Sequence, residues 1–200
     1  MRLLPYGPRA WLVELDEDDV TGFAAAVARA ERADVVEIVP AARTVLVRLS
    51  AGAATAEIGG WLAALEPDDT PAPAGGTIEI PVRYDGEDLG AVAATVGLGV
   101  DEVVARHQAV RYTCAFCGFA PGFAYLRGLD PLLVLPRRPT PRTRVAAGSV
   151  AIAAAYTAVY PSASPGGWHL IGRTEAPLWD PARDPPALIA PGATVRFVPQ

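Results

Sequence analysis

Lysine is absent from this chain of 200 residues, and all 17 basic residues are arginine. Schiff-base catalysis, attachment of pyridoxal phosphate or biotin, and the phosphate-binding lysine of a Walker A loop all need the lysine amine. These kinds of chemistry are therefore excluded for this chain. Arginine stays protonated and binds a carboxylate or phosphate through two parallel hydrogen bonds. The basic residues favour recognition of anions.

Cysteine and histidine are scarce, with two residues of each. Cys114 and Cys117 form a CxxC pair within residues 110–119, an aromatic and β-branched run that indicates a strand rather than the helix N-terminus typical of redox pairs. At positions i and i+3 of a strand, two side chains point to opposite faces, which disfavours a disulfide. No second CxxC is present, so we expect half-buried strand residues and no metal site.

No apolar run approaches the length of a membrane span, and residues 1–15 lack the features of a signal peptide. The net charge of −5 argues against a general binder of nucleic acid or of a membrane surface. Hydrophobic residues make up 51% of the chain, enough for the core of one large domain or two small ones. Because the sequence shows neither a membrane span nor a signal peptide, we expect a cytoplasmic location.

The first 80 residues alternate between strand and helix patterns. Strands are predicted at 10–15, 35–39, 44–49 and 77–82, and helices at 20–32 and 53–65. The order β-α-β-β-α-β is that of a ferredoxin-like domain, in which two helices cover one face of a four-stranded antiparallel sheet. A segment rich in Pro, Asp and Gly at 66–76 precedes the last strand. We place the first domain at 1–80.

The second domain, at 81–200, begins with two short helices and continues as strands separated by Gly and Pro. Helices are predicted at 88–96 and 100–108, and strands at 110–119, 123–126, 149–154, 157–160, 168–173 and 194–198. Many short strands with frequent turns are typical of a β-barrel or a sandwich. The predicted fold class is therefore α+β.

Three motifs in the second domain resemble a known family. They are GFAPGFAYLRGLDP at 118–131, PRRPTPRTRVAAGSVAI at 136–152 and YPSASPGGWHLIGRT at 160–174, and APGATVRFVP follows at 190–199. In this order they resemble allophanate hydrolase subunit 1, also called the B subunit of 5-oxoprolinase or the kinase-inhibitor subunit, of the carboxyltransferase subdomain C/D type. The resemblance is strongest over residues 80–200. It implies an N-terminal ferredoxin-like domain and a C-terminal cyclophilin-like antiparallel β-barrel.

The resemblance implies a subunit rather than a self-sufficient enzyme. Family members pair with a homologous second subunit, known as the C subunit, and with a third, the A subunit, in the ATP-dependent opening of 5-oxoproline to glutamate. It thus predicts a hydrolase complex that cleaves a C–N bond in a small anionic substrate and uses ATP once assembled. One alternative is a regulatory module that inhibits a sensor histidine kinase. Another is a partner of a urea-amidolyase-type enzyme that acts on allophanate.

The sequence departs from the family pattern at two places. Ala146 stands where the family usually has proline, and family glycines and a glutamine are replaced around Ala153 to Tyr156. The replacements at the second place fill space where a glycine would leave room for a ligand.

Residues 116–174 carry six arginines and a single acid, Asp130, and they supply the candidate anion-binding residues. The candidates are Arg142, Arg144, Ser149, Ser164, Gly166, Gly167 and Arg173. For Arg142 and Arg144, a surface of ordinary salt bridges is an equal alternative, whereas Arg173 would anchor an anion if its strand points it into the barrel. The two serines are more typical of turns than of nucleophiles, because no histidine or lysine lies near either in the sequence.

Two further groups complete the candidates. His107 is the candidate acid or base, although a histidine at a helix end more often interacts with the helix dipole. Phe119, Pro121 and Trp168 would line a groove if the barrel keeps the ligand face of the cyclophilin fold, and ordinary core packing is the alternative.

Overall fold

The computed structural model describes residues 1–68 and 76–200. The chain divides into two compact units, Met1–Pro73 and Ala74–Gln200. Residues 69–75, which belong to the Pro- and Gly-rich segment predicted at 66–76, lie outside the described residues.

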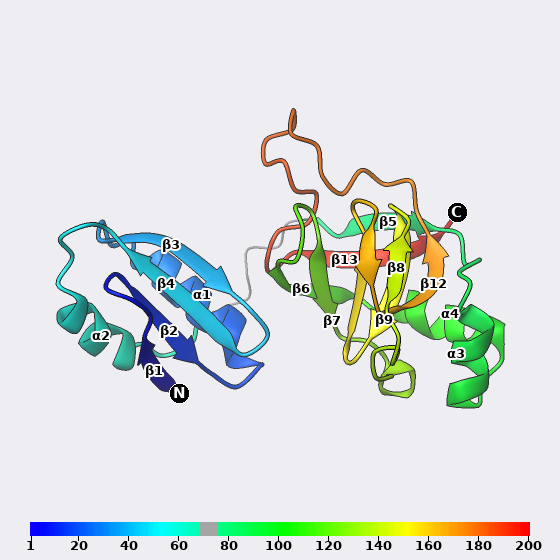
Figure 1. The fold of residues 1–200 in the computed structure, drawn as a ribbon, viewed down its shortest axis with the longest axis horizontal. Helices are drawn as coiled ribbons and strands as arrows, with labels where there is room; N and C mark the ends of the chain where they lie inside the picture. Colours follow the sequence, from blue (N-terminus) through cyan, green and yellow to red (C-terminus); the bar gives the residue numbers. More distant parts are fainter. Residues whose placement is uncertain (69–75) are drawn as a thin grey trace. The chain divides into compact units, whose positions relative to one another are not determined.

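The first unit is an antiparallel sheet with two helices on one face (Figure 1). Its strands are β1 (Arg2–Pro5), β2 (Ala10–Glu14), β3 (Val35–Pro40) and β4 (Thr44–Leu49), in the spatial order β1-β2-β4-β3. Helix α1 (Asp19–Arg29) buries Val20, Phe23 and Val27, whose spacing places them on one helix face. Helix α2 (Thr55–Ala63) buries Ile58 and Leu62, and both helices pack on the alternate apolar residues of the sheet.

The predicted ferredoxin-like arrangement is wrong in its last strand. The strand expected at 77–82 is present as β5 (Ile78–Val82), but it pairs in parallel with β13 (Thr194–Pro199) of the second unit. The edge beside β2 is occupied instead by β1. Sequence analysis missed β1 because this four-residue strand is exposed at both ends and shows no alternation of buried and exposed residues.

The second unit is a seven-stranded sheet that nearly closes into a barrel. Its order is β12-β9-β10-β7-β6-β13-β5, built from β6 (Tyr112–Cys117), β7 (Ala124–Arg127), β9 (Ser149–Ala153), β10 (Tyr156–Val159), β12 (His169–Arg173) and the β5–β13 pair. At the two edges, Arg83 and Arg173 exchange backbone hydrogen bonds of 2.9 Å. The expected antiparallel barrel is correct for every strand pair in this sheet except β5–β13.

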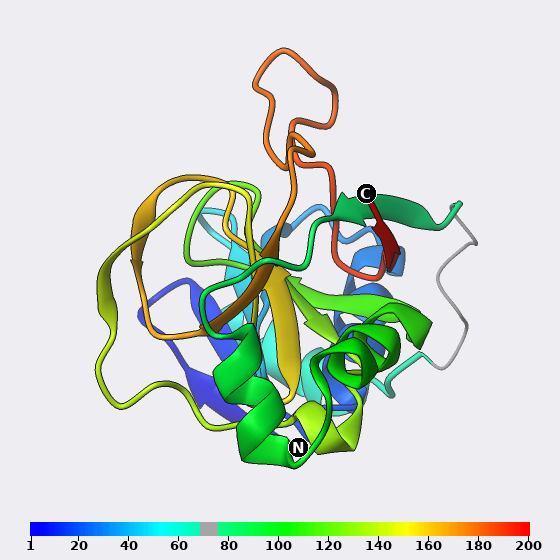
Figure 2. The same cartoon turned by 90° about the vertical axis from the view of Figure 1, so that its right-hand side faces the viewer.

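Two helices lie side by side against this barrel (Figures 1 and 2). They are α3 (Leu89–Val96) and α4 (Val100–Ala109), close to the predicted bounds. Helix α3 ends where Gly97 takes a φ of +71° and donates its backbone N–H to the Ala93 carbonyl. Leu89, Val92 and Val103 enter the barrel core, so the helices cover apolar residues that the strands alone would expose.

A two-stranded ribbon forms a second layer over part of the barrel. It consists of β8 (Arg142–Val145) and β11 (Ser164–Gly166), which sequence analysis did not predict. Strand β9 is consequently buried on both faces: Val150 and Ile152 join the barrel core, whereas Ala151 packs in a second cluster with Val145 of the ribbon. A one-turn helix, η1 (Pro131–Leu133), lies between β7 and β8.

The two cysteines lie together, contrary to the expectation from strand geometry. The β6–β7 register shifts between Cys114 and Phe116, which inserts one extra residue into β6. This bulge turns Cys117 to the same side as Cys114, and the two sulfur atoms are 3.8 Å apart as free thiols. A hydrogen bond to Cys117, together with burial, raises the pKa of Cys114, and the same hydrogen bond lowers the pKa of Cys117.

Candidate functional site

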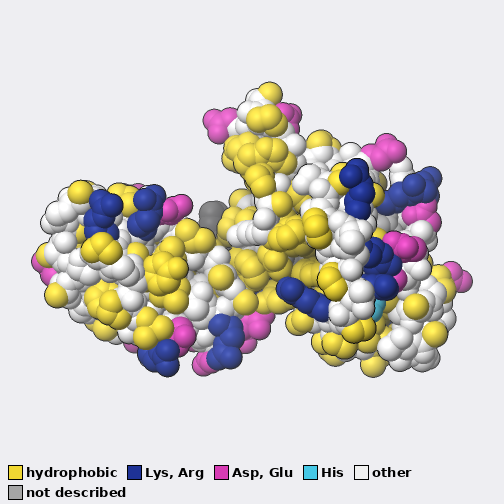
Figure 3. Space-filling model, in the orientation of Figure 1, with side chains coloured by type: hydrophobic (Ala, Val, Ile, Leu, Met, Phe, Trp, Pro, Cys, Tyr) yellow, Lys and Arg dark blue, Asp and Glu magenta, His cyan; other side chains and the backbone are white. Residues whose placement is uncertain are grey.

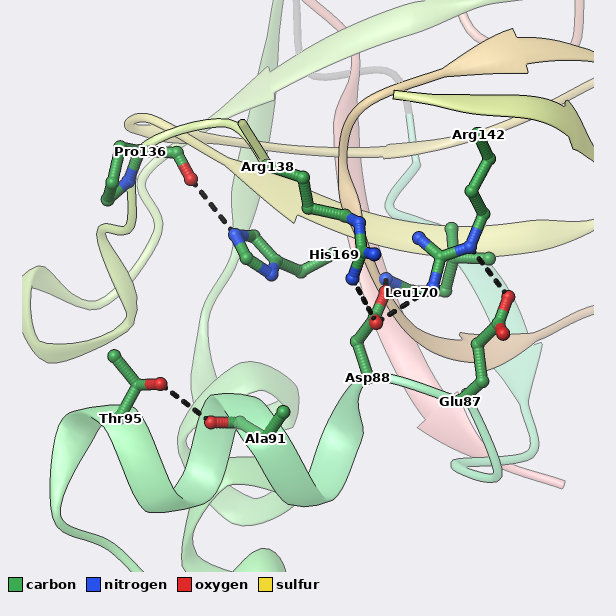
Figure 4. A network of polar contacts seen from close by, with 9 residues as sticks. All are labelled: Glu87, Asp88, Ala91, Thr95, Pro136, Arg138, Arg142, His169 and Leu170. Carbon is green, nitrogen blue, oxygen red and sulfur yellow. Dashed lines mark hydrogen bonds and ion pairs between the residues drawn. The ribbon is translucent and has the colours of Figure 1, made fainter. Parts of the chain in front are cut away.

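A buried carboxylate, Asp88, organises the charged residues of the second unit (Figure 4). The residue is 4% exposed and immediately precedes α3. Its Oδ1 accepts hydrogen bonds from Arg138 at 2.7 Å and from Arg142 at 2.8 Å, and its Oδ2 accepts one from the Leu170 backbone N–H at 2.7 Å. Burial opposes ionisation, but the hydrogen bonds from Arg142 and Leu170 outweigh it and lower the pKa of Asp88.

Arg142 is held in ion pairs within the protein itself. Besides Asp88, its Nε donates to Glu87 at 2.8 Å, so the guanidinium links β8 to the residues that precede α3 (Figure 4). One further nitrogen of Arg142 is buried and has no hydrogen-bond partner among the described residues. The same is true of Arg138 Nε and Ser164 Oγ. This placement favours a structural role for Arg142 over direct contact with a ligand.

Three of the predicted residues, Arg144, Ser149 and Arg173, meet in a cavity of about 440 Å³, which we call the arginine cavity. Arg173 donates two hydrogen bonds to Asp85, at 2.9 and 2.6 Å, and Asp85 also pairs with Arg83. The Arg144 side chain has no ion pair or hydrogen bond with any residue in 1–68 or 76–200. Arg144 is therefore the guanidinium that is free to bind an anion in this cavity.

Close backbone contacts shape the arginine cavity. Gly86 lies so near β12 that an added Cβ would stand 2.3 Å from the Leu170 carbonyl oxygen. Gly148 has a φ of +79°, and its Cβ would stand 2.2 Å from the Thr174 carbonyl oxygen. Any larger residue would push these backbones apart, so the two glycines hold the loop and the turn against β12.

Four other predicted residues line a separate pocket of about 90 Å³, which we call the aromatic pocket. Its lining contains the predicted Phe119, Gly166, Gly167 and Trp168, together with Phe123, Tyr125, Arg137, Tyr160 and Pro165. Pro121 is exposed and does not line it. The aromatic pocket shares no residue with the arginine cavity, and the predicted Arg142 and Ser164 line neither of them.

His107 is fully buried in the barrel core and belongs to neither cavity. Its Nε2 lies 2.9 Å from the Thr157 hydroxyl, which donates its own proton to the Ala151 carbonyl, so Nε2 must carry the hydrogen. Nδ1 then accepts from the Tyr84 hydroxyl at 2.8 Å. Burial lowers the pKa of His107 to about 3. These contacts favour a neutral, structural imidazole over a catalytic acid or base.

On the face drawn in Figure 3, arginine and acidic side chains lie next to one another over the second unit. This pattern agrees with the ion pairs described above, in which most arginines already have a carboxylate partner. No group of three metal-ligating side chains occurs within the described ranges. Those ranges also contain no helix with the length and apolar character of a membrane span.

Comparison with known proteins agrees with the motifs of the second unit. The family described as carboxyltransferase domain, subdomain C and D, matches residues 1–189. The chain belongs to this family.

Two bacterial relatives of this family member are named as the B subunit of 5-oxoprolinase. The protein from Escherichia coli is 55% identical over 126 residues, which cover 62% of this chain and 58% of the relative. The protein from Bacillus subtilis is 44% identical over 124 residues, which cover 60% of this chain and 52% of the relative. The matched part thus spans little more than half the length of either relative.

Three solved structures have a similar fold. TTHA0988 is 36% identical with a TM-score of 0.83, and the match covers 96% of this chain and 40% of that one. A conserved uncharacterized protein from Pyrococcus horikoshii is 38% identical with a TM-score of 0.61, over 100% of this chain and 97% of that one. The urea carboxylase of Kluyveromyces lactis, at 20% identity and a TM-score of 0.73, covers 99% of this chain and 21% of that one, and it supports the fold alone.

Several residues of the site escaped sequence analysis. Asp88 was predicted only as the first residue of a helix, and Asp85 and Glu87 were given no role, although all three determine which arginines are paired. The segment 116–174 has a single acid for its six arginines, so their carboxylate partners had to come from elsewhere in the chain. The acidic cluster DGED at 85–88 could have been recognised as their source. Arg137 was counted only as part of the arginine excess.

Proposed function

We propose that this chain is a subunit of an ATP-dependent hydrolase complex that opens 5-oxoproline to glutamate. It acts only with a homologous second subunit, in a complex that can include a third. The names of its relatives support this proposal. Within the structure, the supporting observation is Arg144, an unpaired guanidinium in an open cavity. An anionic substrate or a phosphorylated form of it needs such a group. We expect the complex in the cytoplasm.

Each residue of the arginine cavity has a distinct task in this proposal. Arg144 binds the carboxylate or phosphate of the substrate, whereas Arg173 pairs with Asp85 and so offsets the charge of a carboxylate that also lines the cavity. Ser149 contributes a hydroxyl that can donate to the bound anion. His107 is too deeply buried to take part, so the acid or base would come from a partner subunit.

ATP would supply the phosphoryl group that activates the amide carbonyl for attack by water. The arginine cavity suits a phosphate better than a whole nucleotide, because no aromatic side chain lines it for an adenine ring. The chain also has no lysine for a Walker A loop. We therefore place nucleotide binding in the assembled complex and leave to this chain the recognition of anionic groups.

The test is co-expression of this chain with its candidate partner subunits. The chain alone should hydrolyse neither ATP nor 5-oxoproline, whereas the complex should couple the two, as measured by release of phosphate and glutamate. Arg144→Gln should raise the KM for 5-oxoproline about tenfold or more, because one charge-assisted contact is lost. Arg111→Gln, which removes the same charge from an exposed site outside both cavities, should change KM little.

Two results would overturn the proposal. A purified complex that is inert toward 5-oxoproline would refute the assignment of this substrate. Turnover of allophanate instead would favour the urea-amidolyase alternative. Capture of a sensor histidine kinase, in the absence of any homologous partner, would favour the regulatory alternative.

A further inference from the structure

Four apolar side chains form a continuous row across one face of the sheet in the first unit, which we call the open face. In the register of the sheet, Leu12 of β2 lies opposite Leu4 of β1 and also opposite Leu46 of β4. Leu46 in turn lies opposite Val39 of β3. Because directly opposite residues of paired strands point to the same face, this apolar row spans all four strands (Figure 1).

The open face is the side of the sheet that the two helices leave uncovered. Neighbours of the row along the strands, such as Val13 and Val45, point to the other side and pack with α1 and α2 in the core of the first unit. Within the described ranges, none of the four residues of the row belongs to that core. Val39 is 38% exposed, and the three leucines are partly buried. A continuous apolar row left outside the core is typical of a surface that binds another protein.

Ion pairs border the apolar row on both sides. Arg2 pairs with Glu14 at 2.9 Å on one side, and Arg48 pairs with Glu37 at 2.6 Å on the other. The four charged side chains are between 41% and 67% exposed, so they lie at the solvent. An apolar centre with a charged, solvated rim is the arrangement of a protein–protein interface.

A hollow of about 610 Å³ lies at one end of the open face. Tyr6 and Val36 both line it and are 61% and 50% exposed. Tyr6 extends the β1–β2 ladder, because its backbone N–H donates to the Ala10 carbonyl at 2.9 Å. Since β1 and β3 are the outer strands of the sheet, three strand spacings, about 14 Å, separate Tyr6 from the β3 residues.

We propose that the open face binds the open face of a second copy of this chain. The two-fold axis runs parallel to the strands, between β2 and β4, and places β1 of one copy over β3 of the other. Leu12 then packs on Leu46 and Leu4 packs on Val39, so the row covers itself, and the Tyr6 ring of each copy enters the hollow of the other. Two sheets stacked with nearly aligned strands are a stable packing. This dimer goes beyond the proposed hydrolase function and does not depend on it.

The charged rim favours this axis over the alternative. With it, Glu37 of one copy meets the Tyr6 hydroxyl of the other, and Glu14 meets the Thr44 hydroxyl, so both carboxylates gain a hydrogen-bond donor. An axis across the strands would also cover the apolar row. It would place Glu14 over Ala10, which has no side-chain donor. The pattern of the face is therefore complementary to itself in one orientation.

Sedimentation equilibrium of the whole chain, without partner subunits or substrate, tests the dimer. The wild type should show a reversible monomer–dimer equilibrium. Val39→Glu, which sets a carboxylate against Leu4 of the second copy, should raise the dissociation constant at least about tenfold. Val100→Glu is the matched control, because Val100 is 43% exposed and lies in the second unit, where the same change should leave the dimer intact. Circular dichroism checks that both variants fold.

A double-mutant cycle tests the axis. Tyr6→Phe and Glu37→Gln should each weaken the dimer several-fold, and the double variant should be no weaker than the weaker single variant. The two residues lie on opposite edges of the sheet, so this coupling can arise only between copies. Additive losses would refute the axis.

Three other results would overturn the dimer itself. They are a wild-type chain that stays monomeric, a dimer that Val39→Glu leaves intact, and a monomer that loses only its partner subunit in Val39→Glu, which would assign the open face to that subunit. Each leaves the hydrolase proposal standing, because that rests on turnover by the complex.

Discussion

Replacing Asp88 by asparagine should destabilise the second unit more than any other single removal of charge described above. The substitution keeps the shape of the side chain but removes the negative charge shared by Arg138 and Arg142. The Arg142 side chain is only 16% exposed, so its charge cannot simply return to water. The asparagine amide can also point donors at the two guanidinium groups, which are donors themselves.

The magnitude follows from burial. Removing one partner of a buried ion pair costs about 3–5 kcal/mol. Arg138 is 32% exposed and is partly screened by solvent, so the lower end applies, about 3 kcal/mol. For a chain of this size, that loss lowers the melting temperature by roughly 6–12 °C. The Leu170 amide, which donates to Asp88, should lose its protection from hydrogen exchange first.

Hydrogen exchange followed by mass spectrometry is the suitable assay, because peptides from β9 and β12 report on the second unit alone. Asp85→Asn is the matched control: its side chain is 35% exposed, so the loss should stay below about 1 kcal/mol. Because the folded pKa of Asp88 lies below its usual value, the stability it gives is present above about pH 4 and is lost as the pH falls through the folded value. Equal effects of the two variants would refute this reasoning.

Two further predictions test the barrel core and the cysteine pair. His107 has a folded pKa of about 3 against an ordinary value of 6.5, so as the pH falls the unfolded chain gains a proton that the folded chain does not. Between pH 7 and pH 5 the free energy of unfolding, measured in urea, should therefore fall by about 2 kcal/mol. The His107→Gln variant should lose this pH dependence. A variant whose free energy of unfolding falls with pH as steeply as that of the wild type would contradict the prediction. Because the sulfurs of Cys114 and Cys117 are 3.8 Å apart, diamide should oxidise both thiols to a disulfide, with loss of two hydrogens in the intact mass. Two thiols that persist in the folded chain would show that the bulge prevents bonding.

Local patterns predicted most helices and strands but not their partners. A few neighbouring residues are enough to predict the end of α3 at Gly97 and the strand β4, whose side chains alternate between buried and more exposed. The β8–β11 ribbon escaped notice because β8 buries a single residue and β11 has only three residues. The five residues of β5 could not show which sheet it joins, because its partner β13 is more than 100 residues away in the sequence.

The candidate site was predictable to a similar degree. Arg144, Ser149 and Arg173 were among the anion-binding candidates chosen from the sequence, and the structure brings all three to one cavity. Which arginine is free depends on acids far away in the sequence; Asp88, for example, is 54 residues from Arg142. His107 was chosen for its residue type, whereas its burial among Tyr84, Thr157 and other core residues emerges only from tertiary packing.

The parallel pairing of β5 with β13 has a consequence for folding during synthesis. In the barrel sheet, β13 lies between β5 and β6, and β5 has no other strand neighbour in that sheet. While the ribosome is still making residues 83–193, β5 presents an unpaired backbone edge, and the barrel lacks an inner strand. Contacts so distant in sequence slow folding, and open strand edges attract other chains. The nascent second unit should therefore depend on chaperones or on a partner subunit until β13 has emerged.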